Sequence, residues 1–181
     1  MIISLCQAKE LPGYSDKTDD EIKNLLDSIE EMVRSKTHNN FQNTNIRYCA
    51  GSAIGDIEGY TWLEGEFPYL KVGDTIQITE SIINDGLFVI KRIDGGRMEL
   101  DKPLYEWGHN LITKIEYPAS IRQGCINLLK WEAANRSKVG IKSETISRHS
   151  VTYYDQDSNN QDTGYPASLV GFLKPYMKAR F

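Results

Sequence analysis

Histidine and cysteine are the residue types in this chain that could bind a metal or serve as base and nucleophile. The three histidines are His38, His109 and His149, and the three cysteines are Cys6, Cys49 and Cys125. The sequence has no His-x-x-x-His pair and no Cys/His cluster, so the spacing fits no zinc motif. An odd number of widely spaced cysteines suits a reducing compartment.

Carboxylates are the next candidates, because two of them can act as an acid–base pair or bind a cation. Asp74, Asp85, Asp94 and Asp101 all fall at predicted turns, where hydrogen bonding of the Asp side chain to the backbone explains each one alone. Residues 155–160 (Asp-Gln-Asp-Ser-Asn-Asn) are similar to a calcium loop but lack its glycine and its final glutamate. We therefore predict no catalytic residue, no metal site and no cofactor, and we expect that the chain is not an enzyme.

Two other features could bind a ligand. Residues 51–55 (Gly-Ser-Ala-Ile-Gly) contain two glycines, but no strand followed by a helix surrounds them as in a phosphate-binding loop. Tyrosines and tryptophans in residues 60–117 could form a stacking platform for single-stranded nucleic acid, as in OB-type barrels. Basic residues do not alternate with these aromatics, so packing in a core is the favoured interpretation.

Composition and charge favour assembly over catalysis. The chain has 181 residues, of which 40% are hydrophobic, and a net charge of −4. Residues 1–117 hold 12 basic and 20 acidic side chains, whereas residues 118–181 hold 9 basic and 5 acidic ones. Such polarity could align identical subunits, and the absence of a large basic cluster argues against bulk nucleic-acid binding. No long apolar run and no signal peptide is present, so we expect no membrane partner.

Three helices are predicted from apolar spacing and capping signals. Thr18 and Glu21 form a capping box, and apolar residues at helical spacing follow to about Ser35. A second helix runs from about residue 118 to residue 138. A third begins at Tyr165 and ends with the chain, with Pro175 expected to kink or break it. One or two helical turns are expected in residues 4–11.

Between residues 46 and 117 the pattern changes to short strands. They are predicted at residues 60–63, 75–79, 87–90, 97–100 and 111–117. The Asn-Asp-Gly motif at residues 84–86 and the Asp-Gly-Gly motif at residues 94–96 supply the positive φ angles of tight hairpins. The spacing of these strands predicts a small antiparallel sheet or a partly closed barrel.

Residues 140–164 form a polar stretch between two helices and contain few apolar residues. Their alternation suits an extended strand, for which the chain offers no obvious neighbour. A soluble domain of this size rarely carries such a long segment without a core of its own. We therefore expect the segment to be an arm that lies on a neighbouring subunit, mobile in the monomer and ordered in the assembly.

Several motifs resemble those of one family when they are taken in order. The opening Met-Ile-Ile-Ser-Leu and the acidic first helix are followed by residues 115–125 (Ile-Glu-Tyr-Pro-Ala-Ser-Ile-Arg-Gln-Gly-Cys) and by residues 139–154 (Val-Gly-Ile-Lys-Ser-Glu-Thr-Ile-Ser, then Val-Thr-Tyr-Tyr). The chain closes on Gly164-Tyr165-Pro166, Leu169, Phe172 to Tyr176, and Arg180. Together these resemble the head–tail connector, or adaptor, proteins of tailed bacteriophages. Ser147 stands where the usual arm has a glycine, and residues 46–114 exceed the strand region of shorter members.

The resemblance implies a structural virion protein that forms a dodecameric ring in the neck of the particle, after assembly in the host cytoplasm. Its partners would be other copies of itself, the portal protein, and a stopper or other neck or tail protein. Genome DNA would pass through the lumen without sequence recognition. Two alternatives stay open: a neighbouring neck component (a stopper or tail-completion protein), which need not possess the C-terminal helix, and a small nucleic-acid or ligand-binding module.

The expected fold is α+β: a helical frame of N-terminal, central and C-terminal helices with an inserted antiparallel β-subdomain and an extended arm. The expected parts are residues 1–45 (N-terminal part of the frame), 46–117 (β-subdomain), 118–139 (central helix), 140–164 (arm) and 165–181 (C-terminal docking helix).

Two sets of residues are predicted to make contacts in the assembly. The terminal helix carries an apolar stripe beside basic residues and no acid, which suits docking to the portal. The docking residues are Leu169, Phe172, Leu173, Tyr176, Lys178 and Arg180. The inter-subunit arm residues are Ile141, Ile146, Arg148, Val151, Tyr153 and Tyr154. The alternative for the terminal helix is that it only covers the core of its own subunit.

Overall fold

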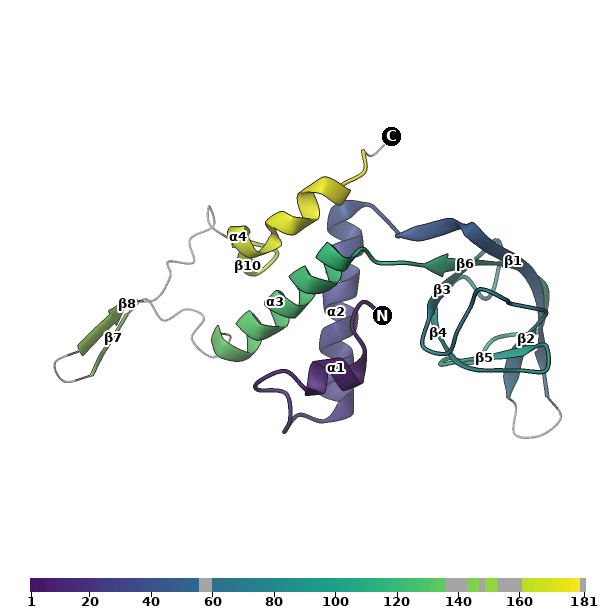
Figure 1. The fold of residues 1–181 in the computed structure, drawn as a ribbon, viewed down its shortest axis with the longest axis horizontal. Coiled ribbons are helices and arrows are strands. Elements are labelled where there is room, and N and C mark those ends of the chain that lie inside the picture. Colours follow the sequence, from purple (N-terminus) through teal and green to yellow (C-terminus); the bar gives the residue numbers. More distant parts are fainter. Residues whose placement is uncertain (56–59, 136–142, 147–148, 153–160, 180–181) are drawn as a thin grey trace. The chain divides into compact units, whose positions relative to one another are not determined.

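The computed structural model describes residues 1–55, 60–135, 143–146, 149–152 and 161–179. The chain divides into two compact units (Figure 1). Met1 and Asn40–Glu116 form the barrel unit, and Ile2–Asn39 with Tyr117–Phe181 forms the helical unit. The barrel unit therefore lies between the two segments of the helical unit in the sequence.

The barrel unit is a closed barrel of six strands, all paired in antiparallel fashion. The strands are β1 (Gln42–Ile54), β2 (Thr61–Glu64), β3 (Thr75–Thr79), β4 (Gly86–Asp94), β5 (Arg97–Leu100) and β6 (Trp107–Ile115). Their order around the barrel is β1-β2-β5-β4-β3-β6, and the strands curl into a ring in Figure 1. Closure leaves no unpaired sheet edge among the described strands of this unit.

Alternation along the strands fills the barrel with apolar side chains. In β5 and β2, Met98 and Leu63 face each other across the ladder and both are fully buried. Ile78 and Ile112 form the same kind of pair between β3 and β6. The interior is completed by Ala50, Phe67, Leu70, Ile76, Phe88, Ile90, Leu100 and Leu104. Burial of these side chains is the main force that holds the barrel closed.

The helical unit packs short helices on two long ones. Its helices are α1 (Leu5–Lys9), α2 (Asp19–Thr37), α3 (Ala119–Asn135), α4 (Ala167–Val170) and the 3-10 helix η2 (Gly171–Tyr176). The capping box predicted at Thr18 and Glu21 is confirmed. Pro175 lies inside the 3-10 helix, and the change from α-helix to 3-10 helix comes earlier, at Gly171. The third helix was expected to begin at Tyr165 and to end with the chain, but Tyr165 and Pro166 form a short strand and the helix ends at Tyr176.

A buried polar pair lies inside the helical unit. Tyr117 donates a hydrogen bond to Oε1 of Glu30 at 2.8 Å, and Glu30 is only 6% exposed. Burial, followed by the negative charge of Glu30, raises the pKa of Tyr117 far above its ordinary value. Burial also raises the pKa of Cys125 to about 12. Both side chains are therefore protonated at neutral pH and act as packing groups.

Two short sheets follow α3. Strands β7 (Ser143–Ile146) and β8 (His149–Thr152) form an antiparallel hairpin in which Ile146 pairs with His149. Strands β9 (Gln161–Asp162) and β10 (Tyr165–Pro166) form the second pair, which leads into α4. The ring of Tyr165 meets Trp131 of α3 edge-on, with centroids 5.5 Å apart.

The predicted fold class is wrong. The structure is 34% helix and 31% strand, and its dominant feature is a closed six-stranded barrel, not a helical frame with an inserted subdomain. The 13-residue strand β1 is the reason, because it pairs with both β2 and β6 and so closes the sheet. Its sequence (Gln-Asn-Thr-Asn-Ile-Arg-Tyr-Cys-Ala-Gly-Ser-Ala-Ile) is too polar and irregular to indicate a strand, and two register shifts interrupt it.

The structure also corrects the expectation of an extended arm. We expected its strand to lack a neighbour in its own chain, but β7 and β8 pair with each other. Residues 136–142, 147–148 and 153–160 lie outside the described residues, so the expectation that the arm orders on assembly stays a prediction.

Candidate functional site

The three histidines considered as possible metal ligands or bases lie on separate elements of the described structure. His38 ends α2, His109 is exposed on β6, and His149 belongs to β8. Among the described residues, no group of three or more His, Cys, Asp or Glu side chains could hold a metal ion. No helix in the described part of the chain is long and apolar enough to cross a bilayer.

The four aspartates make local hydrogen bonds and ion pairs. Asp74 accepts from the amide of Lys71 at 2.9 Å and pairs with Lys114 at 2.8 Å. Asp85 accepts from the Ser81 amide, and Asp101 accepts from an amide of β4. Asp94 forms an ion pair with Arg92, also on β4. Turn and strand geometry therefore accounts for each carboxylate.

The predicted docking residues lie mainly within the helical unit. Leu173 is fully buried, and Leu169, Phe172 and Tyr176 are half-buried. Phe172 lies against Gly124 of α3, where an added Cβ would come within 2.4 Å of its ring. Lys178 is exposed, and Arg180 lies outside the described residues. Contact of this stretch with the portal stays a prediction.

The chain end is fixed to α2 by its backbone. The amide of Lys178 donates to the carbonyl of Thr37 at 2.8 Å, and the side chain of Asn39 donates to the carbonyl of Tyr176. The Tyr176 hydroxyl also bonds to Ser120. The terminal stretch therefore covers the core of its own helical unit and presents only its outer side to solvent.

The predicted arm residues can be placed only in part. Ile146 is the last residue of β7 and Val151 belongs to β8. Ile141, Arg148, Tyr153 and Tyr154 lie outside the described residues.

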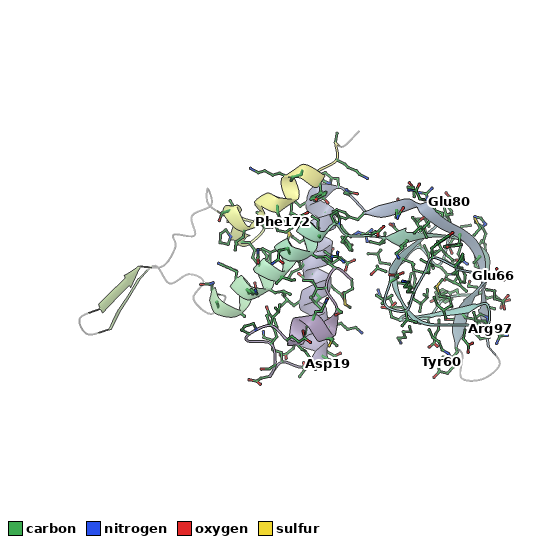
Figure 2. The ribbon with its side chains drawn as sticks, viewed as in Figure 1. Asp19, Tyr60, Glu66, Glu80, Arg97 and Phe172 are labelled. Atoms are coloured by element: carbon green, nitrogen blue, oxygen red, sulfur yellow. The ribbon has the colours of Figure 1, made fainter. Side chains whose placement is uncertain are left out.

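The outer wall of the barrel carries a shallow pocket of about 420 Å³ over β2, β4 and β5. The guanidinium of Arg97 lies 4.5 Å from the centroid of the Trp62 ring, and Figure 2 shows Arg97 on the outside of the barrel. The six-membered ring of this indole also approaches the backbone of Gly55, where an added Cβ would lie 2.5 Å from it. The guanidinium of Arg97 therefore covers one face of the indole.

A different surface of the barrel exposes apolar side chains. Ile82 is 80% exposed, Ile83 is 44% exposed and Tyr105 is 68% exposed. We call these three residues the isoleucine–tyrosine patch. Ile82 and Ile83 lie in the loop between β3 and β4, and Tyr105 lies between β5 and β6. Hydrogen bonds between the Asn84 side chain and the backbone of Tyr105 bring these two segments together, and contiguous exposed apolar surface often marks an interaction site.

A buried polar network connects the two loops that carry this patch. The side chain of Asn84 accepts from the amide of Tyr105 at 2.8 Å and donates to the carbonyl of the same residue at 2.9 Å. It also donates to Asn110 Oδ1 at 3.1 Å and to Ser52 Oγ at 3.2 Å. Asn84 and Asn110 are 4% and 0% exposed. The side-chain amide of Asn84 thus pairs with both backbone groups of Tyr105, as a neighbouring strand would. These bonds hold together the two segments that carry the patch.

Comparison with protein-family models and with curated proteins gives no match for this chain.

Sequence reasoning missed the patch. Residues 81–86 (Ser-Ile-Ile-Asn-Asp-Gly) contained the signal, because two adjacent isoleucines precede a turn motif and successive side chains of an extended chain cannot share one face. Tyr105 carried no such signal, since its position beside the loop depends on the folded barrel.

Proposed function

We propose that this protein is a structural subunit of the neck of a tailed bacteriophage, a head–tail connector that assembles as a ring between the portal and the stopper or tail. The order of sequence motifs that resembles the connector family suggests this role. In the proposed ring, each subunit contacts the next, and genome DNA passes through the lumen without sequence recognition.

The β7–β8 hairpin is the observation that carries the proposal. Its strands pair only with each other among the described strands. An isolated two-stranded sheet is marginally stable in water, because it has too little apolar area to offset the entropy of ordering its chain. A neighbouring subunit would supply the missing surface, as expected for an arm in a ring.

The charge of the barrel supports a structural role over recognition of nucleic acid. Residues 40–116 hold 7 basic and 12 acidic side chains, a net charge of −5. Nucleic-acid binding depends on neutralising phosphates with basic residues, which this unit lacks in excess. A nucleic-acid module is therefore the weaker alternative.

A pair of prolines in the hairpin should separate assembly from folding. Thr145 and Ser150 are paired in the hairpin, and proline at both positions removes their amide donors. We expect Thr145→Pro with Ser150→Pro to give folded monomers, whereas the control Thr145→Ser with Ser150→Thr assembles like the wild type. Sedimentation velocity measures assembly, and thermal unfolding shows that both units remain folded. Unchanged assembly of the proline variant would remove the hairpin from the subunit contact.

A further inference from the structure

The loop that carries the isoleucine–tyrosine patch holds two residues in an unusual backbone conformation. Glu80 has φ of 60° and Ile82 has φ of 67°. A β-branched residue rarely adopts positive φ, because its side chain crowds the backbone. Ile82 is nevertheless the most exposed large apolar residue among those described in the chain.

Buried groups hold this loop in place. Ser81 is fully buried, its amide donates to Asp85, and its hydroxyl accepts from the amide of Asn84 at 3.0 Å. The carbonyl of Ser81 also accepts from the amide of Ile83 at 2.8 Å. Strain that is held by surrounding hydrogen bonds, at a site where an apolar side chain faces water, points to a function for that side chain.

Acidic residues accompany the patch. Glu80 and Asp85 flank Ile82 and Ile83 in the loop, Glu106 follows Tyr105, and all three carboxylates belong to exposed residues. Figure 2 places Glu80 at the edge of the barrel. Lys102 is the exposed cation of the segment between β5 and β6 that contains Tyr105, and its side chain donates to the carbonyl of Leu87. A complementary partner would present an apolar side chain flanked by cations.

The helical unit of the same chain presents such a group. Met177 is 51% exposed and is the one exposed large apolar residue among the described residues of this unit. Lys174 and Lys178 are exposed on either side of it, and no acidic residue occurs in residues 163–181. The bond from the Lys178 amide to Thr37 and the burial of Leu173 fix its backbone. A methionine side chain adapts well to an apolar surface.

We propose that the isoleucine–tyrosine patch of one copy binds Met177 of a second copy, with Lys174 and Lys178 facing the carboxylates of Glu80, Asp85 and Glu106. This inference rests on the proposed ring, because it names one of its subunit contacts. Two different surfaces meet, so the contact is heterologous and repeats from copy to copy into a ring or a filament. It assigns the exposed side of the C-terminal stretch to the next subunit and not to the portal.

Charge reversal on each surface tests the contact. One variant carries Glu80→Lys and Glu106→Lys, and the other carries Lys174→Glu and Lys178→Glu. We expect each to weaken self-association by roughly tenfold or more, because like charges then meet at the contact. Combining all four changes should restore association. Matched controls are Lys130→Glu on α3 and Val72→Asp, a residue that is 63% exposed in another loop of the barrel.

Mixing two variants shows whether the patch and Met177 meet between copies and not within one chain. A variant with Ile82→Asp lacks the patch, and one with Met177→Asp lacks its partner, so each keeps a single competent surface. We expect their equimolar mixture to form heterodimers that do not grow further, as measured by sedimentation velocity and native mass spectrometry. Thermal unfolding of each variant confirms that it is folded.

The outcomes distinguish this inference from the proposed function. If wild-type rings form and the charge-reversal variants form them equally well, the patch is not the contact, although the ring stands. If the four changes together do not restore association, the lysines and the carboxylates do not face each other and the proposal is wrong. If the wild type stays monomeric both alone and with the portal, the contact and the ring are both refuted.

Discussion

Replacing Asn84 with alanine should lower the free energy of unfolding of the barrel unit by roughly 3 kcal/mol, because several buried polar groups lose their partner at once. The Asn84 side chain lies within hydrogen-bonding distance of four groups: both backbone groups of Tyr105, Asn110 Oδ1 and Ser52 Oγ. Alanine can bond to none of them, and the groups around it are too buried for water to replace every bond.

Urea unfolding followed by tryptophan fluorescence measures this loss, since Trp62 and Trp107 both belong to the barrel unit. Asn45→Ala is the matched control, because Asn45 is an exposed asparagine of β1 and its change should stay within about 0.5 kcal/mol of the wild type. If Asn84→Ala unfolds like the control, the network does not hold the two loops together.

We expect Gly124→Val to destabilise the helical unit by about 3 kcal/mol, because the new side chain overlaps Phe172. A Cβ at this position would lie 2.4 to 2.5 Å from three carbons of the Phe172 ring. The ring cannot move far, since the neighbouring Leu173 is fully buried in the same short helix. The small gain in helix propensity from removing a glycine does not offset such a clash.

Gly171→Ala is the matched control for this prediction. Gly171 has a right-handed helical backbone and no neighbouring atom within 4 Å of an added Cβ, so alanine should leave stability unchanged or raise it by about 0.5 kcal/mol. Adding Phe172→Ala to Gly124→Val should recover part of the loss, because the smaller side chain makes room. Additive effects in this double-mutant cycle would show that the two positions do not clash.

One local signal in the sequence, the Asn-Asp-Gly motif at residues 84–86, predicted local structure wrongly. None of its residues has positive φ, and the positive φ angles of that loop belong to Glu80 and Ile82.

Other local signals in the sequence predicted local structure well. Thr18 and Glu21 began α2 as expected, because a capping box satisfies amide groups within four residues. The tight turn at Gly95 and Gly96 was also predicted correctly, and both residues have positive φ. In each case the interaction that decides the conformation lies inside the motif itself.

Long-range pairing decided what the sequence could not predict. Strand β1 is stabilised by ladders to β2 and β6, and its polar residues give no apolar alternation. The isoleucine–tyrosine patch depends in the same way on residues 82 and 105, whose segments are joined by hydrogen bonds of Asn84. Charge polarity along the chain was visible in the sequence. The position of acidic side chains beside an exposed apolar patch could not be predicted, because it depends on the fold.

Electron microscopy of the purified protein, alone and mixed with purified portal rings of the phage that is proposed to carry it, tests the central claim most directly. We expect closed rings of this protein, stacked coaxially on the portal, with the hairpin of each subunit in contact with the next. Particles that stay monomeric at high concentration and leave the portal bare would contradict the account.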